Sequence, residues 1–62
     1  MKVSSVYLLR EVEKYLITHG VSPARFGRDV MGDPRFVFDL RAGREPRTRT
    51  IRRVQAYLDR VQ

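Results

Sequence analysis

The chain has 62 residues and no cysteine, which limits it to one small domain that no disulfide can stabilise. It has a single histidine, no nucleophile–base constellation and no glycine-rich phosphate loop. We therefore expect no enzyme activity, cofactor, metal or small-molecule ligand. No run of residues is long enough to span a bilayer and no secretory signal peptide is recognisable, so we expect a soluble, cytoplasmic protein. The formal net charge of +6 indicates a polyanionic partner, although a merely solubilising basic surface would carry the same charge.

Four helices and no strand are predicted. The first helix begins at Ser4 or Ser5, either of which can cap it, and ends at Gly20, because glycine tolerates left-handed backbone angles. Its apolar residues recur at three- and four-residue steps, which is typical of one buried helical face. These residues are Leu8, Leu9, Val12, Tyr15 and Leu16.

Two short helices follow, each with a start signal and a glycine stop. Ser22-Pro23 predicts a helix over about residues 23–31, which Gly32 ends. Asp33-Pro34 repeats the signal with an acid at the positive end of the helix dipole, and predicts a helix over about residues 34–42. Gly43 ends that helix.

The last helix runs to the C-terminus. Thr48 is the preferred cap, with Arg47 and Thr50 as alternatives. Its apolar residues keep helical spacing and are Ile51, Val54, Leu58 and Val61.

Residues 21–58 resemble the lambda-repressor-like (Cro/C1, or XRE) helix-turn-helix proteins of bacteria and phages. Gly27 stands where that family has a small residue at the crossing of its two motif helices. The apolar residues that flank the crossing and anchor the second motif helix are matched by Phe26, Val30, Val37 and Leu40. The family's later glycine–basic–proline and threonine–apolar signals are matched by Gly43, Arg44, Pro46 and Thr50-Ile51. The sequence departs from the family at Gly32, which comes one position later than usual, and at Asp33-Pro34, which replaces a leading Gln or Ser.

The resemblance implies an all-α, four-helix lambda-repressor-like domain over residues 1–62, with the helix-turn-helix at about residues 23–42. It implies a sequence-specific protein that binds double-stranded DNA, a small Cro-like transcriptional regulator associated with the nucleoid. Operators in this family have paired half-sites, so we expect a homodimer at least on DNA. The helix over about residues 34–42 would enter the major groove. Its outward positions, carried over from the family, are Asp33, Pro34, Arg35, Phe38, Asp39 and Ala42.

Four of these positions are candidates for reading bases: Pro34, Arg35, Phe38 and Asp39. Arg35 can bind guanine O6 and N7 together, or it is a phosphate contact or a solvated charge. Phe38 either contacts a thymine methyl group or packs in the core or a dimer contact, whereas Phe36 is expected in the core. Asp39 can accept from cytosine N4, but we favour an i, i+4 pair that orients Arg35.

Arginines dominate the segment that follows the reading helix. Eleven of the 13 basic residues are arginines, and residues 35–62 carry eight basic and three acidic groups, against five and four in residues 1–34. The planar guanidinium fork suits phosphate. The candidate phosphate contacts are Arg41, Arg44, Arg47, Arg49, Arg52 and Arg53, with Arg25 and Arg28 as weaker candidates. About six neutralised phosphates would give a slope of log affinity against log salt of roughly −5.

Three alternatives stay open. In the first, the arginines form only a solvated charge run. In the second, the chain is a protein-interaction adaptor that uses the same fold, antitoxin-like or polymerase-binding. Its basic face would then meet an acidic protein. A non-specific, chromatin-type DNA-binding protein would show the same charge distribution but would select no DNA sequence.

Overall fold

Four helices joined by short turns make up the part of the chain that the computed structural model describes, residues 5–61. They are α1 (Ser5–His19), α2 (Pro23–Met31), α3 (Phe36–Arg41) and α4 (Thr48–Val61), and no strand occurs among these residues. The all-helical, four-helix prediction is therefore confirmed. Ser4, one of the two predicted caps of the first helix, lies outside the described residues. None of the helices within residues 5–61 is long and apolar enough to cross a membrane.

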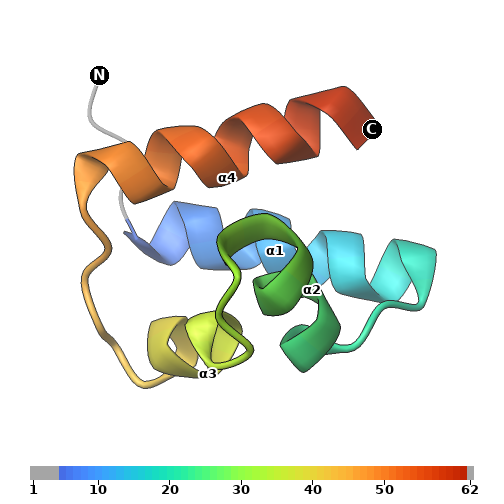
Figure 1. Ribbon diagram of the computed structural model, residues 1–62, viewed down its shortest axis with the longest axis horizontal. Coiled ribbons are helices and arrows are strands. Elements are labelled where there is room, and N and C mark those ends of the chain that lie inside the picture. The colour runs from blue at the N-terminus through green and yellow to red at the C-terminus, as the bar shows by residue number, and fades with distance from the viewer. Residues whose placement is uncertain (1–4, 62) are drawn as a thin grey trace.

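The core lies between α4 at the top of Figure 1 and α3 at the bottom. Each helix contributes its predicted apolar face, and Phe36 is buried as expected. The exception is Val61, which is 38% exposed. The buried residues are Leu8, Val12, Tyr15, Leu16, Phe26, Val30, Phe36, Val37, Leu40, Val54 and Leu58.

The bounds of α2 agree with the sequence prediction because both of its ends are capped as expected. The Ser22 side chain accepts a hydrogen bond of 3.2 Å from the backbone N–H of Arg25, and Pro23 occupies the first turn. At the other end Gly32 has a left-handed φ of 67°. Its N–H donates to the carbonyl of Arg28 at 3.0 Å, so the chain turns sharply towards α3.

At Gly27 there is no room for a side chain between α2 and the turn that leads into α3. A Cβ at this position would collide with the carbonyl oxygen of Asp33 and lie 3.2 Å from the Cβ of Phe36. The carbonyl of Gly27 also accepts a hydrogen bond of 3.1 Å from the N–H of Asp33. Position 27 therefore has to lack a side chain if α3 is to keep this position against α2.

The third helix is shorter than predicted. It begins at Phe36 rather than at Pro34 and ends at Arg41 rather than at Ala42. Asp33 closes a tight turn ahead of it, because its Oδ1 accepts from the N–H of Arg35 at 3.0 Å and its carbonyl accepts from the N–H of Phe36 at 3.1 Å.

The fourth helix also differs slightly from the preferred prediction. Thr48 is its first residue, and the carbonyl of Arg47 accepts from the N–H of Ile51 at 3.0 Å. The boundary therefore lies at Arg47, one of the two alternatives, because the intrahelical hydrogen bonds begin at its carbonyl.

Candidate nucleic-acid interface

One side of α3 faces the core and the other faces outward. Phe36, Val37 and Leu40 are buried. Arg35, Phe38 and Ala42 follow at three- and four-residue steps on the opposite side and are exposed, and we call these three residues the outer strip. The Phe38 side chain is 48% exposed, so the interpretation that placed it in the core is wrong.

One edge of α3 is joined to α1 by an ion pair. The Arg41 guanidinium donates from Nε to Glu13 Oε2 at 2.7 Å and from Nη2 to Oε1 at 2.8 Å, a bidentate arrangement. The hydrogen bond from Arg41 lowers the pKa of the Glu13 carboxyl below its ordinary value of 4.5, and the same bond raises the pKa of Arg41. The Arg41 guanidinium carbon also lies 5.7 Å from the centre of the Phe38 ring. Arg41, a predicted phosphate contact, thus holds α3 against α1, and a phosphate would have to compete with Glu13.

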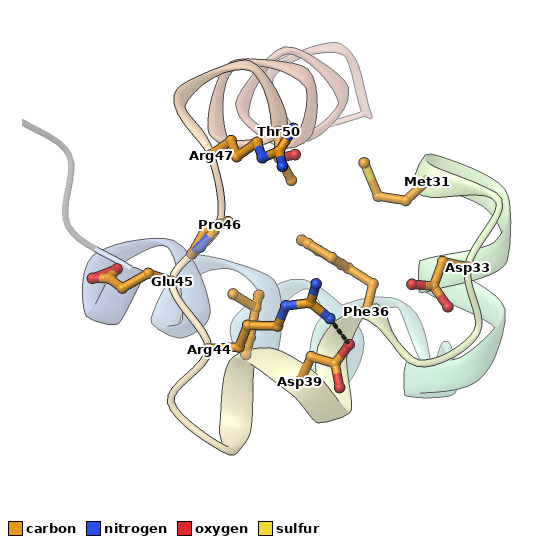
Figure 2. A pocket seen from close by; sticks show the side chains of 10 residues that line it. Met31, Asp33, Phe36, Asp39, Arg44, Glu45, Pro46, Arg47 and Thr50 are labelled. Atoms are coloured by element: carbon orange, nitrogen blue, oxygen red, sulfur yellow. Dashed lines mark hydrogen bonds and ion pairs between the residues drawn. The ribbon is translucent and has the colours of Figure 1, made fainter.

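The opposite edge of α3 is joined to the loop that follows it. Asp39 Oδ2 accepts from Arg44 Nη1 at 3.1 Å, which is the dashed line in Figure 2. The predicted pair between Asp39 and Arg35 is therefore replaced, because the carboxylate turns towards the loop instead of back along the helix. Within residues 5–61, no carboxylate lies within 4.0 Å of the Arg35 guanidinium.

A hollow of about 330 Å³ opens between α3, the loop to α4 and the end of α2 (Figure 2). Carboxylates and guanidiniums both line it, so their charges largely cancel. It contains the Asp39–Arg44 pair and also Arg47, which has no ion-pair partner among the described residues. The lining residues are Met31, Asp33, Phe36, Asp39, Leu40, Arg44, Glu45, Pro46, Arg47 and Thr50.

The predicted phosphate contacts fall into two groups. Arg41, Arg44 and Arg47 lie on α3 or in the loop beside it. The others lie on α4, which is on the far side of the core from α3 (Figure 1). This second group is Arg49, Arg52 and Arg53, all exposed and, within residues 5–61, all without a carboxylate within 4.0 Å.

The weaker candidates lie on α2 and are both exposed. Arg25 Nε lies 3.7 Å from Asp29 Oδ2, an i, i+4 ion pair. Arg28 has no ion-pair partner in the described part of the chain. Of the two, Arg28 is therefore the one whose guanidinium needs to break no ion pair in order to contact a phosphate.

A second basic hollow, between α2 and α4, was not predicted from the sequence. Its volume is about 400 Å³, and it is lined by Asp29, Val30, Arg53, Ala56, Tyr57 and Arg60. Arg53 and Arg60 are seven residues apart and so share a helical face, a signal that the sequence contained.

Comparisons with known proteins leave these features to be interpreted on their own. No family model, no curated protein and no solved structure matches this chain. Among residues 5–61 no group of three or more His, Asp or Glu side chains is arranged to hold a metal ion. What the site can do therefore follows from its arginines, its exposed ring and the helix that presents them.

Proposed function

We propose that this protein binds double-stranded DNA in a sequence-specific manner, as a small Cro-like transcriptional regulator in which α2 and α3 form a helix-turn-helix. The observation that carries the proposal is the outer strip. It presents an unpaired guanidinium and an exposed aromatic ring on a helix whose other side is buried. In a helix-turn-helix, such a surface on the second helix meets base edges in the major groove.

Each side chain around the strip has a distinct role in this proposal. Arg35 binds guanine O6 and N7, and Phe38 contacts a thymine methyl group. Arg47 binds phosphate, which positions the protein without reading sequence. Arg41 and Asp39 hold α3 between α1 and the following loop through their ion pairs, so that the strip is presented in a fixed orientation.

The ion pairs reduce the salt dependence that a count of arginines suggests. Of the six predicted phosphate contacts, Arg41 and Arg44 already have carboxylate partners, which leaves four. With about 0.9 counterions released per phosphate, the slope of log affinity against log salt should be no steeper than about −4.

Binding of the purified protein to random-sequence duplexes, followed by sequencing of the retained DNA, tests the proposal. We expect a short enriched sequence containing a guanine that depends on Arg35, and binding that weakens with salt as calculated. Retention without an enriched sequence would favour non-specific, chromatin-type binding. Absence of binding at low salt would contradict both DNA-binding interpretations.

The hollow between α2 and α4 supports a second candidate, a protein-interaction adaptor. Arg53 and Arg60 line it, together with the apolar side chains of Tyr57, Ala56 and Val30. Such a groove suits an acidic, partly apolar protein segment. The double substitution R53E/R60E should abolish partner capture in the adaptor and leave the enriched DNA sequence unchanged in the regulator.

A further inference from the structure

Exposed apolar side chains are more frequent on α1 than on the other helices. Five large apolar side chains are exposed among the residues whose side chains are described, and three of them, Val6, Tyr7 and Ile17, lie on α1. Val6 is 68% exposed and Ile17 83% exposed. Val6, Arg10, Glu13 and Ile17 follow one another at steps of four, three and four residues, so they share one helical face, which we call the α1 outer face.

The charges of α1 also favour self-association through this helix rather than through α4. Its four charged residues are Arg10, Glu11, Glu13 and Lys14, so its net charge is zero, whereas α4 carries four arginines against one aspartate. Two copies of a chain with a net charge of +6 repel each other across most of their surface. That repulsion is weakest where the charges of one helix cancel.

We propose that the α1 outer face is a dimer interface, on which a second copy of this chain packs with its α1 antiparallel. A two-fold axis through the middle of the helix sets Val6 of each copy opposite Ile17 of the other, and Arg10 opposite Glu13. This face is therefore self-complementary, as a two-fold interface requires. The inference deepens the proposed function, on which its consequence for paired DNA half-sites rests, whereas self-association itself needs no DNA.

Glu13 couples this interface to α3. Each carboxylate oxygen has two lone pairs, and Arg41 uses one on each oxygen, so Glu13 can still accept from Arg10 of the second copy. Dimerisation would add a second cation to the carboxylate that holds Arg41, and would extend the Glu13–Arg41 link into a network across the two-fold axis.

A single pair of helices buries less surface than a standard stable interface. α1 has 15 residues and is therefore about 22 Å long. Two helices of this length bury an area in the range of transient interfaces. We therefore expect dissociation constants between micromolar and millimolar. Two neighbouring half-sites on one duplex would raise the effective concentration and favour the dimer there.

Disulfide trapping tests the antiparallel arrangement directly, because the chain has no cysteine of its own. A mixture of Val6→Cys and Ile17→Cys proteins should form a disulfide-linked heterodimer under mild oxidation, since those positions meet across the axis. Each variant alone should crosslink at least about tenfold less. A mixture of Val6→Cys with Thr18→Cys serves as the control, because Thr18 is exposed but lies off this face. Efficient crosslinking of each single variant with itself would instead indicate parallel helices and overturn the proposal.

Sedimentation equilibrium over micromolar to millimolar concentrations supplies the second measurement. Ile17→Glu should weaken self-association about tenfold or more, because it places a carboxylate opposite Val6, whereas Thr18→Glu should not. A wild-type protein that stays monomeric throughout would overturn the dimer. If such a monomer still selected a DNA sequence, the proposed function would stand without the dimer. If a dimer formed but bound no duplex, the dimer interface would stand and the proposed function would be wrong.

Discussion

Two arginines beside α3, Arg41 and Arg44, lie in a different environment from the four arginines of α4. Arg41 and Arg44 are ion-paired with carboxylates on other segments of the chain. The four arginines of α4, residues 49, 52, 53 and 60, have no carboxylate within 4.0 Å in the described part of the chain. The first group fixes the position of a helix, and the second supplies exposed positive charge that has no ion-pair partner in the described part of the chain. A count of arginines is therefore not a count of available phosphate contacts.

The two regions also differ in how they join the core. At Gly27 the backbone of α2 lies against the backbone of Asp33, in the turn that leads into α3, whereas α4 packs through the side chains of Val54 and Leu58. Side chains can adjust by changing rotamer, but two backbones in contact cannot. We therefore expect substitutions at the junction of α2 and α3 to have the largest effects.

Gly27→Ala tests this difference most severely. The added methyl group collides with the carbonyl oxygen of Asp33 and crowds Phe36, so we expect a loss of about 1–3 kcal/mol despite the higher helix propensity of alanine. Thermal unfolding followed by circular dichroism should show the melting temperature lowered by at least about 4 °C. Gly32→Ala is the control, because it is strained only by its φ of 67° and has open space around it. An unchanged melting temperature for Gly27→Ala would contradict the close approach.

Arg35→Ala should have the next largest effect, on DNA binding rather than on stability. Loss of the bidentate contact should cost about 1–3 kcal/mol on the preferred sequence and relax the choice at one base position. Competition binding against single-base variants of the selected site measures both quantities. Arg60→Ala, an exposed arginine on α4, is the matched control. An equal loss on every sequence would move Arg35 to the class of phosphate contacts.

Arg49 and Arg52 differ in their position along α4. Both are exposed, but Arg49 lies in the first turn, directly after the loop that borders α3, and Arg52 lies almost one turn further along the helix. Arg49→Ala should weaken binding to all duplexes alike and reduce the salt slope by about one. Arg52→Ala should leave the slope unchanged. Equal effects of the two would mean that the duplex also contacts α4 beyond its first turn.

The smallest effect concerns pH. Because Arg41 lowers the pKa of Glu13 in the folded state, the ion pair stabilises the fold fully above the ordinary value of 4.5 and loses that contribution as the pH falls through the lower, folded value. Glu13→Gln should therefore unfold more readily than wild type near neutral pH, and the difference should vanish in acid. Both side chains are partly exposed, so solvent screening keeps the effect small. Urea titrations at several pH values measure it, with Glu11→Gln as a control; a difference that grew in acid would contradict the assignment.

Local signals predicted most of the fold. Ser22-Pro23 and Gly32 gave the bounds of α2 because capping depends on residues within one turn of each other. Apolar spacing likewise predicted nearly all of the core. Asp33-Pro34 predicted the start of α3 two residues too early, because Asp33 closes a turn ahead of α3 instead of capping its first residues.

The partners of the charged residues could not be predicted in the same way. Glu13 and Arg41 are 28 residues apart, so only the folded arrangement of α1 and α3 brings them together. Asp39 had two cations within reach along the chain, Arg35 and Arg44, and spacing alone could not choose between them. The choice depends on the turn at Gly43, which brings Arg44 back beside the helix.

The separation between the outer strip and the core has a practical consequence. Arg35, Phe38 and Ala42 contribute nothing to the buried cluster, and Glu13 and Asp39 secure the helix from its two edges. The three positions can therefore be randomised together in a library without dismantling the domain. Selection of such a library on duplex DNA would show whether these three positions determine a DNA sequence preference, as the proposed function requires.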